Sequence, residues 1–123
     1  MRKVLVVEDS SAMRGLIASI VEQVDDCEVV EVSSGFDALR QLPRETFSLI
    51  ITDINMPDIN GLELIGYVKS NPAYSAIPLI IVSTEKSEED KKRGLSLGAS
   101  GYVVKPFRKE DLMSAVAKAL EGK

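Results

Sequence analysis

One stretch near the middle of the chain decides the fold: Ile50-Ile51-Thr52-Asp53-Ile54-Asn55-Met56-Pro57. An apolar run that begins at Leu49 stops at an acid, and Asn60-Gly61 then supplies turn residues. The pattern predicts a buried strand with Asp53 at its carboxyl end. Ligands of open parallel sheets bind just outside that end. Asp53 is therefore the first candidate for a functional residue, although a single acid in such a place usually only caps a strand or turn.

The composition is typical of one ordinary globular domain. The chain has 123 residues, of which 45% are hydrophobic and 28% charged. Its net charge of −4, without a long block of like charge, argues against nucleic acid as a direct partner. The single cysteine, Cys27, excludes an internal disulfide and favours a reducing cytoplasm. No apolar run approaches the ~20 residues of a membrane span, so we expect no membrane association.

Regular patterns on both sides of the central stretch predict alternating strands and helices. Short apolar or alternating runs predict strands at 4–7, 28–32, 47–52, 78–82 and 101–104. Between them, apolar residues spaced as on one face of a helix predict a helix after each strand. The predicted caps are Ser10 or Ser11, Ser34, Asn60, the run at 87–90, and Gly98 and Gly122 as closing glycines. The first helix carries an apolar stripe of Met13, Leu16, Ile17, Ile20, Val21 and Val24.

Alternation at this spacing predicts an α/β fold, a doubly wound parallel sheet with helices on both faces. The flavodoxin-like strand order 2-1-3-4-5 is the usual arrangement at this size. That order places the first and third strands side by side, so their carboxyl ends share one edge of the sheet.

Polar residues follow the predicted strands at that edge: Glu8, Asp9, Asp53, Ser83, Thr84 and Lys105. Three carboxylates this close repel one another, and a hard divalent cation such as Mg²⁺ relieves the repulsion. Asp53 could then act as a nucleophile that forms an aspartyl phosphate, with Lys105 and the cation offsetting charge on the phosphoryl group. Ser83 could donate a hydrogen bond to a phosphoryl oxygen. Each residue also has a plain structural interpretation, for example an ion pair between Lys105 and Asp53.

Four segments together resemble a response-regulator receiver domain, in particular a single-domain regulator of the chemotaxis type. They are Val4-Leu5-Val6-Val7-Glu8-Asp9-Ser10, Asp53-Ile54-Asn55-Met56-Pro57 with Gly61, Ser83-Thr84-Glu85 and Gly101-Tyr102-Val103-Val104-Lys105-Pro106-Phe107. The resemblance covers essentially the whole chain, so we expect residues 1–123 to form one receiver domain.

The resemblance implies a role for each of these residues. Asp53 would accept a phosphoryl group from the phosphohistidine of a histidine kinase. Asp9, Asp53 and the backbone carbonyl of Asn55 would hold Mg²⁺, with Glu8 assisting through water. Ser83 and Lys105 would contact the phosphoryl group, and the Lys105-Pro106 peptide would be cis.

Two further roles concern rate and output. Asn55 and Glu85 occupy positions that influence the dephosphorylation rate in the family, and Tyr102 occupies that of the switch aromatic. Tyr102 would change a face formed by the predicted strand 101–104 and the helices on either side of it, and a downstream protein would bind there. The outer surface expected for this face comprises Glu88, Glu89, Lys91, Lys92, Arg93, Arg108, Lys109 and Met113.

The chain departs from the family pattern at a few points. Glu8 replaces the commoner Asp, and Ser83 stands where Thr is common, but both keep the functional group. Most members carry an output domain, whereas this chain stops after the fifth predicted helix. It therefore either acts alone, as a cytoplasmic monomer that catalyses only its own phosphorylation and dephosphorylation, or is a receiver domain excised from a larger regulator. Met1 and the Gly122-Lys123 end favour the first alternative.

Two other classes of protein share parts of the pattern. A phosphatase of the haloacid-dehalogenase type also uses a strand-end Asp, but it needs an acid two residues further on, where this chain has Asn55. It also needs a cap insertion, for which 123 residues leave no room. A flavodoxin-like cofactor carrier needs a phosphate-binding loop after the first strand, where Glu8-Asp9 would repel the phosphate.

Overall fold

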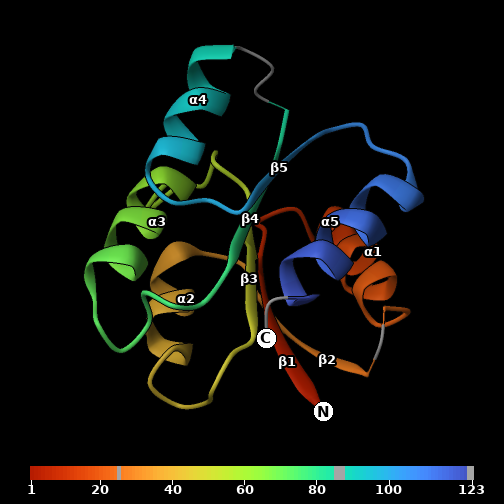
Figure 1. Ribbon diagram of the computed structural model, residues 1–123, viewed down its shortest axis with the longest axis horizontal. Coiled ribbons are helices and arrows are strands. Elements are labelled where there is room, and N and C mark those ends of the chain that lie inside the picture. Colours follow the sequence, from red (N-terminus) through yellow and green to blue (C-terminus); the bar gives the residue numbers. More distant parts are fainter. Residues whose placement is uncertain (25, 85–87, 122–123) are drawn as a thin grey trace.

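The computed structural model describes residues 1–24, 26–84 and 88–121, and within them five strands alternate with five helices (Figure 1). The strands are β1 (Arg2–Val7), β2 (Cys27–Val32), β3 (Leu49–Thr52), β4 (Leu79–Ser83) and β5 (Gly101–Val104). The helices are α1 (Ser11–Val21), α2 (Gly35–Gln41), α3 (Gly61–Ser70), α4 (Glu88–Ser96) and α5 (Lys109–Glu121).

The strands form one parallel sheet in the order β2-β1-β3-β4-β5, which confirms the predicted fold. Helices α1 and α5 cover one face of the sheet, and α2, α3 and α4 cover the other (Figure 1). Both faces of the central strands are therefore buried, which is why β1, β3 and β4 consist largely of Val, Leu and Ile.

The core has two layers because alternate strand residues point to opposite faces of the sheet. Val4 and Val6 of β1 pack with residues of α1 and α5, such as Ile17 and Val116. Leu5 and Val7 pack with residues of α2 and α3 on the other face. The alternation fixes the register between neighbouring strands, because a shift of one residue would exchange the two layers. The register in turn determines which residues lie side by side at the carboxyl edge.

Local capping explains most of the helix boundaries. Ser10, Ser34 and Asn60 are the N-caps of α1, α2 and α3, and Asn60 forms a reciprocal capping box with Glu63. Gly98 follows α4 with a φ of 113°, a left-handed conformation that favours glycine. The predicted capping run at 87–90 begins outside the described residues. The predicted closing residue Gly122 also lies outside them.

Some sequence predictions were wrong in detail. Leu16 was expected on the packed face of α1 but is 47% exposed, because the helix turns that position outward. Met113 was expected on an outer surface but is partly buried against the core. Strand β3 begins at Leu49 rather than at residue 47, where Phe47 is already buried in the approach to the strand.

Among the residues that the structure describes, no helix has the length and apolar character needed to cross a membrane.

Candidate functional site

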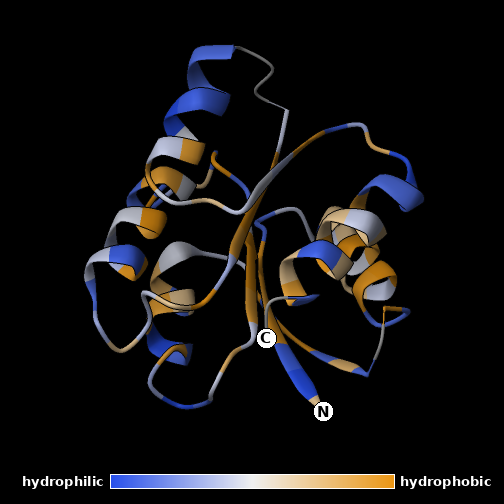
Figure 2. Ribbon diagram, in the orientation of Figure 1, coloured by the Kyte–Doolittle hydropathy of each residue, from blue (hydrophilic) through white to orange (hydrophobic). Residues whose placement is uncertain are grey.

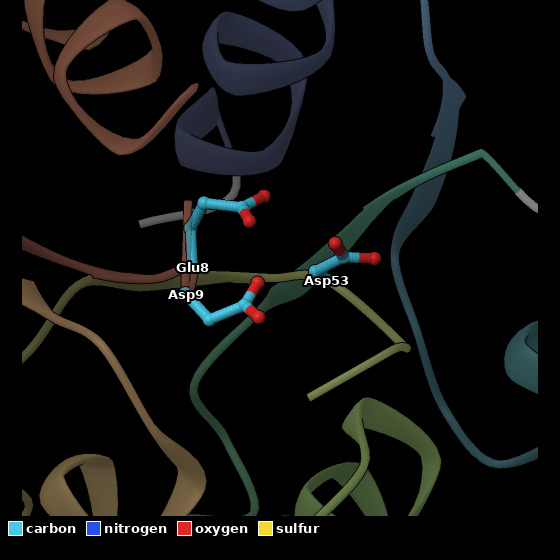
Figure 3. A group of neighbouring side chains, drawn as sticks. All are labelled: Glu8, Asp9 and Asp53. Atoms are coloured by element: carbon cyan, nitrogen blue, oxygen red, sulfur yellow. The ribbon is translucent and has the colours of Figure 1, made fainter. Parts of the chain in front are cut away.

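Three carboxylates meet at the carboxyl edge of the sheet, as the sequence predicted. Oxygen atoms of Glu8, Asp9 and Asp53 all lie within 4.8 Å of one another. Figure 3 shows Glu8 and Asp9 pointing to opposite sides of the end of β1, with Asp53 beside them at the end of β3. The register explains the meeting, because Val7 of β1 pairs with Thr52 of β3 and the next residues are Glu8 and Asp53.

The backbone holds Asp53 in a defined position. Its N–H donates to the carbonyl of Val7 at 3.2 Å, which continues the ladder between β3 and β1. Its Oδ1 accepts hydrogen bonds from the N–H groups of Ile54 at 2.6 Å and Asn55 at 3.3 Å. Gly61 lies so close that a Cβ there would be 2.1 Å from the Asp53 carbonyl oxygen, so a side chain at Gly61 would displace the loop.

Lys105 bridges two of the three acids. Its Nζ lies 2.7 Å from Oε1 of Glu8 and 3.0 Å from Oδ2 of Asp53. Lys105 follows β5, and its N–H donates to the carbonyl of Ser83 at 2.8 Å, so the ends of β4 and β5 fix its position. The ion pair between Lys105 and Asp53 is thus present, and Glu8 is a second partner that the sequence did not reveal. The peptide between Lys105 and Pro106 is cis, as the resemblance implied.

Burial changes the acid–base behaviour of this group. Glu8 is 1% exposed, and burial raises the pKa of its carboxyl above 4.5. The charge of Asp53 also raises this pKa, whereas Lys105 and the Ser10 N–H lower it by a smaller amount. Burial alone would lower the pKa of Lys105, but hydrogen bonds to Glu8 and Asp53 outweigh it and raise the pKa above 10.5. One charged ammonium therefore serves two buried carboxyls at neutral pH.

The other predicted residues surround this group at different depths. Ser83 is fully buried at the end of β4, whereas Thr84 and Asn55 are exposed. Tyr102 is half-buried on β5 and packs against the layer that contains Ile81. Glu85 lies outside the described residues, so its predicted influence on dephosphorylation stays a prediction.

Two charged residues that the sequence analysis missed support the loops of the site. Arg14 on α1 donates from Nη1 to the carbonyl oxygen of Glu8 at 2.9 Å, and its Nε lies 3.6 Å from Oε1 of Glu31. Asp58 accepts hydrogen bonds from two backbone N–H groups at the start of α2. Neither hydrogen bond has a sequence signature, because each involves a backbone group: Asp58 bonds to N–H groups of a distant segment, and Arg14 bonds to a carbonyl six residues earlier in the chain.

The donor set fits a hard divalent cation. Three carboxylates offer oxygen atoms within 4.8 Å of one another, and Lys105 contacts only two of them among the described residues. The local charge therefore stays negative, and oxygen-rich anionic sites of this kind suit Mg²⁺.

Comparison with known proteins agrees with this geometry. Residues 4–117 match the family model described as the response regulator receiver domain. The chain belongs to this family. Receiver domains are phosphorylation-controlled switches of two-component signalling, and this is the functional class of the chain.

Two relatives and one solved structure match nearly the whole chain. The chain is 36% identical over 119 residues to a chemotaxis protein CheY homolog of Campylobacter jejuni, covering 96% of this chain and 92% of that protein. It is 33% identical over 114 residues to protein PilG of Pseudomonas aeruginosa, covering 93% of this chain and 84% of that protein. The structure of CheY4 of Vibrio cholerae superposes with a TM-score of 0.88 and 34% identity, covering 98% of this chain and 99% of that one.

Proposed function

We propose that residues 1–123 form a single receiver domain that accepts a phosphoryl group from a histidine kinase on Asp53. One observation carries the proposal: three carboxylates converge at one edge of the sheet, and a buried lysine contacts two of them. The two buried acids, Glu8 and Asp53, share one ammonium, and the exposed Asp9 adds a third carboxylate beside them, which supports the binding of a cation.

Asp53 is the phosphoacceptor in this proposal. The hydrogen bonds from Ile54 and Asn55 hold its Oδ1, and Lys105 contacts its Oδ2, so the carboxylate is oriented before a phosphodonor arrives. A carboxylate oxygen attacks the phosphorus of a phosphohistidine, a P–O bond forms, and the P–N bond breaks as the imidazole leaves. The domain catalyses only this transfer and the later hydrolysis.

Asp9, Asp53 and the backbone carbonyl of Asn55 would hold Mg²⁺, with Glu8 assisting through water. The ion would offset the negative charge of the transferring phosphoryl group. Lys105 already lies beside Asp53, so it can shift from that carboxylate to a phosphoryl oxygen while its contact with Glu8 remains. Ser83 at the end of β4 donates its hydroxyl to another phosphoryl oxygen.

The output face in this proposal comprises α4, β5 and α5. A groove of 710 Å³ lies on it between β5 and α5, with Tyr102, Phe107 and Lys118 in its lining. Movement of Ser83 toward the phosphoryl group makes space into which the Tyr102 ring turns. Reversing a 1:99 equilibrium to 99:1 requires about 5.5 kcal/mol, so we expect incomplete switching that partner binding completes. The relatives' names favour a chemotaxis partner, and we expect a cytoplasmic monomer.

Acetyl phosphate tests the phosphoacceptor directly. With Mg²⁺, intact-protein mass spectrometry should show one added phosphoryl group that hydroxylamine removes, as expected for an acyl phosphate. Asp53→Asn and chelation of Mg²⁺ should each abolish the adduct, whereas Asp37→Asn, at an acid of α2 that pairs with Arg40, should leave it unchanged. An adduct that persists in Asp53→Asn and maps to Ser83 or Thr84 would contradict the proposal.

A further inference from the structure

The loop that carries Asp53 and Asn55 is fastened to a neighbouring helix at a single acidic residue. This loop spans residues 53–60, between β3 and α3. The two carboxylate oxygens of Asp58 accept hydrogen bonds from the first two N–H groups of α2, from Gly35 at 3.1 Å and from Phe36 at 2.9 Å. Asp58 is thereby joined to residues that lie 23 and 22 positions earlier in the sequence.

The start of α2 also lies close to the loop at Gly35. A Cβ on Gly35 would lie 2.7 Å from the Cβ of Ile59 and 3.0 Å from its carbonyl oxygen. Glycine therefore allows the start of α2 to rest directly on the loop. Asp58 and Gly35 together define the distance between the loop and the helix.

These hydrogen bonds are additional to the ordinary cap of α2. The side chain of Ser34 caps the helix by accepting from the N–H of Asp37 at 3.1 Å. Asp58 serves the two N–H groups that Ser34 does not reach. The N–H of Phe36, with those of Ile59 and Gly35, holds the pKa of Asp58 at about 2, so its carboxylate is available to accept both bonds at neutral pH.

The segment between Asp58 and the site is short and stiff. Its far end is fixed where the N–H groups of Ile54 and Asn55 bond to Asp53 and where Gly61 donates to the Ile54 carbonyl at 2.9 Å. Between the two anchors, Pro57 has a fixed φ and restricts the residue before it. The direction of the Asn55 carbonyl is therefore determined by both anchors.

We propose that Asp58 is a positioning residue for the divalent-cation site, because it holds the Asn55 carbonyl in place by fastening the loop 53–60 to α2. The inference rests on the proposed function, since it requires that Asn55 contribute to cation binding. Asp58 itself does not contact the ion.

Removing the acceptor tests one side of this junction. In divalent-free buffer titrated with Mg²⁺, Asp58→Asn should weaken binding, and Asp58→Ala should weaken it further because no acceptor oxygen remains. Groups that orient metal ligands typically change affinity 10–100-fold, and for this exposed contact we expect about threefold to tenfold. Calorimetry or amide NMR shifts give the affinity without reference to phosphorylation. Asp37→Asn removes an acid from the same helix start without touching the loop and should leave affinity unchanged.

Removing a donor tests the other side. Phe36→Pro deletes one of the two N–H groups at a helix position where proline is tolerated, and should weaken Mg²⁺ binding as Asp58→Asn does. Phe36→Ala removes the exposed ring but keeps the N–H, and should match the wild type. This pair also covers the case in which an Asp58 variant fails to fold.

The outcomes separate this inference from the proposed function. Suppose that the wild type binds Mg²⁺ and accepts a phosphoryl group, and that Asp58→Asn and Phe36→Pro bind Mg²⁺ with the wild-type affinity. Asp58 then only stabilises α2, and the inference is wrong. If the variants phosphorylate more slowly at saturating Mg²⁺ with unchanged Mg²⁺ affinity, the inference is also wrong. If the wild type neither binds Mg²⁺ nor accepts phosphate, the proposed function fails first. A higher Mg²⁺ requirement with a normal rate at saturation supports the inference.

Discussion

Helices α3 and α4 lie on the same face of the sheet but are attached to it in different ways. Helix α3 buries Gly61, Leu62, Leu64, Ile65 and Val68. Of the residues of α4, all of which the structure describes, Gly94 alone is buried. Figure 2 shows the contrast, since most of α4 is hydrophilic whereas α3 has an apolar side toward the sheet.

The contrast indicates that α4 can move at a lower cost in free energy than α3. Each fully buried Leu or Ile contributes about 1.5–3 kcal/mol, and α4 has none. Local opening is easiest where few apolar side chains are buried. Helix α4 follows Ser83 in the chain and lies beside Tyr102, where we propose that phosphorylation is read out. The firmly attached α3 instead supports the loop that holds Asp53.

Truncation of a core residue should produce the largest difference between the two helices. Ile65→Ala in α3 should lower the free energy of unfolding by about 2–5 kcal/mol, because it leaves a cavity at a fully buried position. Leu95→Ala in α4, at a residue that is 43% exposed, should change it by less than about 0.5 kcal/mol. Urea unfolding of both variants measures this. Equal losses would mean that α4 is as firmly packed as α3.

Much of this fold was readable from the sequence because its signals are local. Apolar runs located the buried strands, and Asn60 and Ser34 marked the starts of α3 and α2. Strand order then brought Glu8, Asp9 and Asp53 together without knowledge of any contact. The exposure of Leu16 was missed because an apolar stripe does not define how far the helix face extends.

The contacts that refine the site could not be predicted in this way. The Glu8 partner of Lys105 depends on side-chain directions at two strand ends, and the alternation of strands gives only the positions of those ends. Asp58 and Arg14 bond to backbone groups, which every residue possesses, so no residue pattern indicates the partner. The assignments of the Mg²⁺ ligands and of the phosphoacceptor stay predictions, since they concern how these residues interact with Mg²⁺ and a phosphoryl group.

Glycine-to-alanine substitutions sharpen the comparison at a smaller scale. A Cβ on Gly66 of α3 meets no atom within 4 Å, so Gly66→Ala should stabilise by about 0.5–1 kcal/mol through helix propensity. A Cβ on Gly94 of α4 would lie 2.6 Å from Cδ1 of Ile81 and 3.7 Å from Cδ2 of Tyr102. Crowding should offset the gain for Gly94→Ala and shift the Tyr102 ring signals in NMR spectra. If Gly94→Ala is as stabilising as Gly66→Ala and Tyr102 is unchanged, α4 does not rest on Gly94.

Two acids near the carboxyl edge of the sheet, Glu8 and Asp58, should contribute to stability with opposite pH dependence. Glu8 joins Lys105 after β5, and burial raises its pKa in the folded state above 4.5. Its contribution to stability is therefore present at low pH and lost as pH rises through the folded pKa. Asp58 joins α2, and its pKa of about 2 lies below the ordinary 3.8, so its contribution is present above 3.8 and lost as pH falls through about 2.

Unfolding curves against pH in divalent-free buffer test these signs. Relative to the wild type, Glu8→Gln should gain stability as pH rises above 4.5, whereas Asp58→Asn should lose stability as pH rises from about 2 to 3.8. The effect of Asp58 should be small because its side chain is exposed. Curves with the same sign for both variants would contradict the assigned environments.

The central claim is that occupancy of Asp53 by a phosphoryl group changes α4, β5 and α5 while α3 stays fixed. Amide and aromatic NMR spectra with and without beryllofluoride, in the presence of Mg²⁺, test it most directly, with Asp53→Asn as the control. We predict shifts at Ser83, Thr84 and Tyr102 and through α4, little change along the buried residues of α3, and no response in the control. Shifts confined to the neighbours of Asp53, with Tyr102 and α4 unchanged, would contradict the claim.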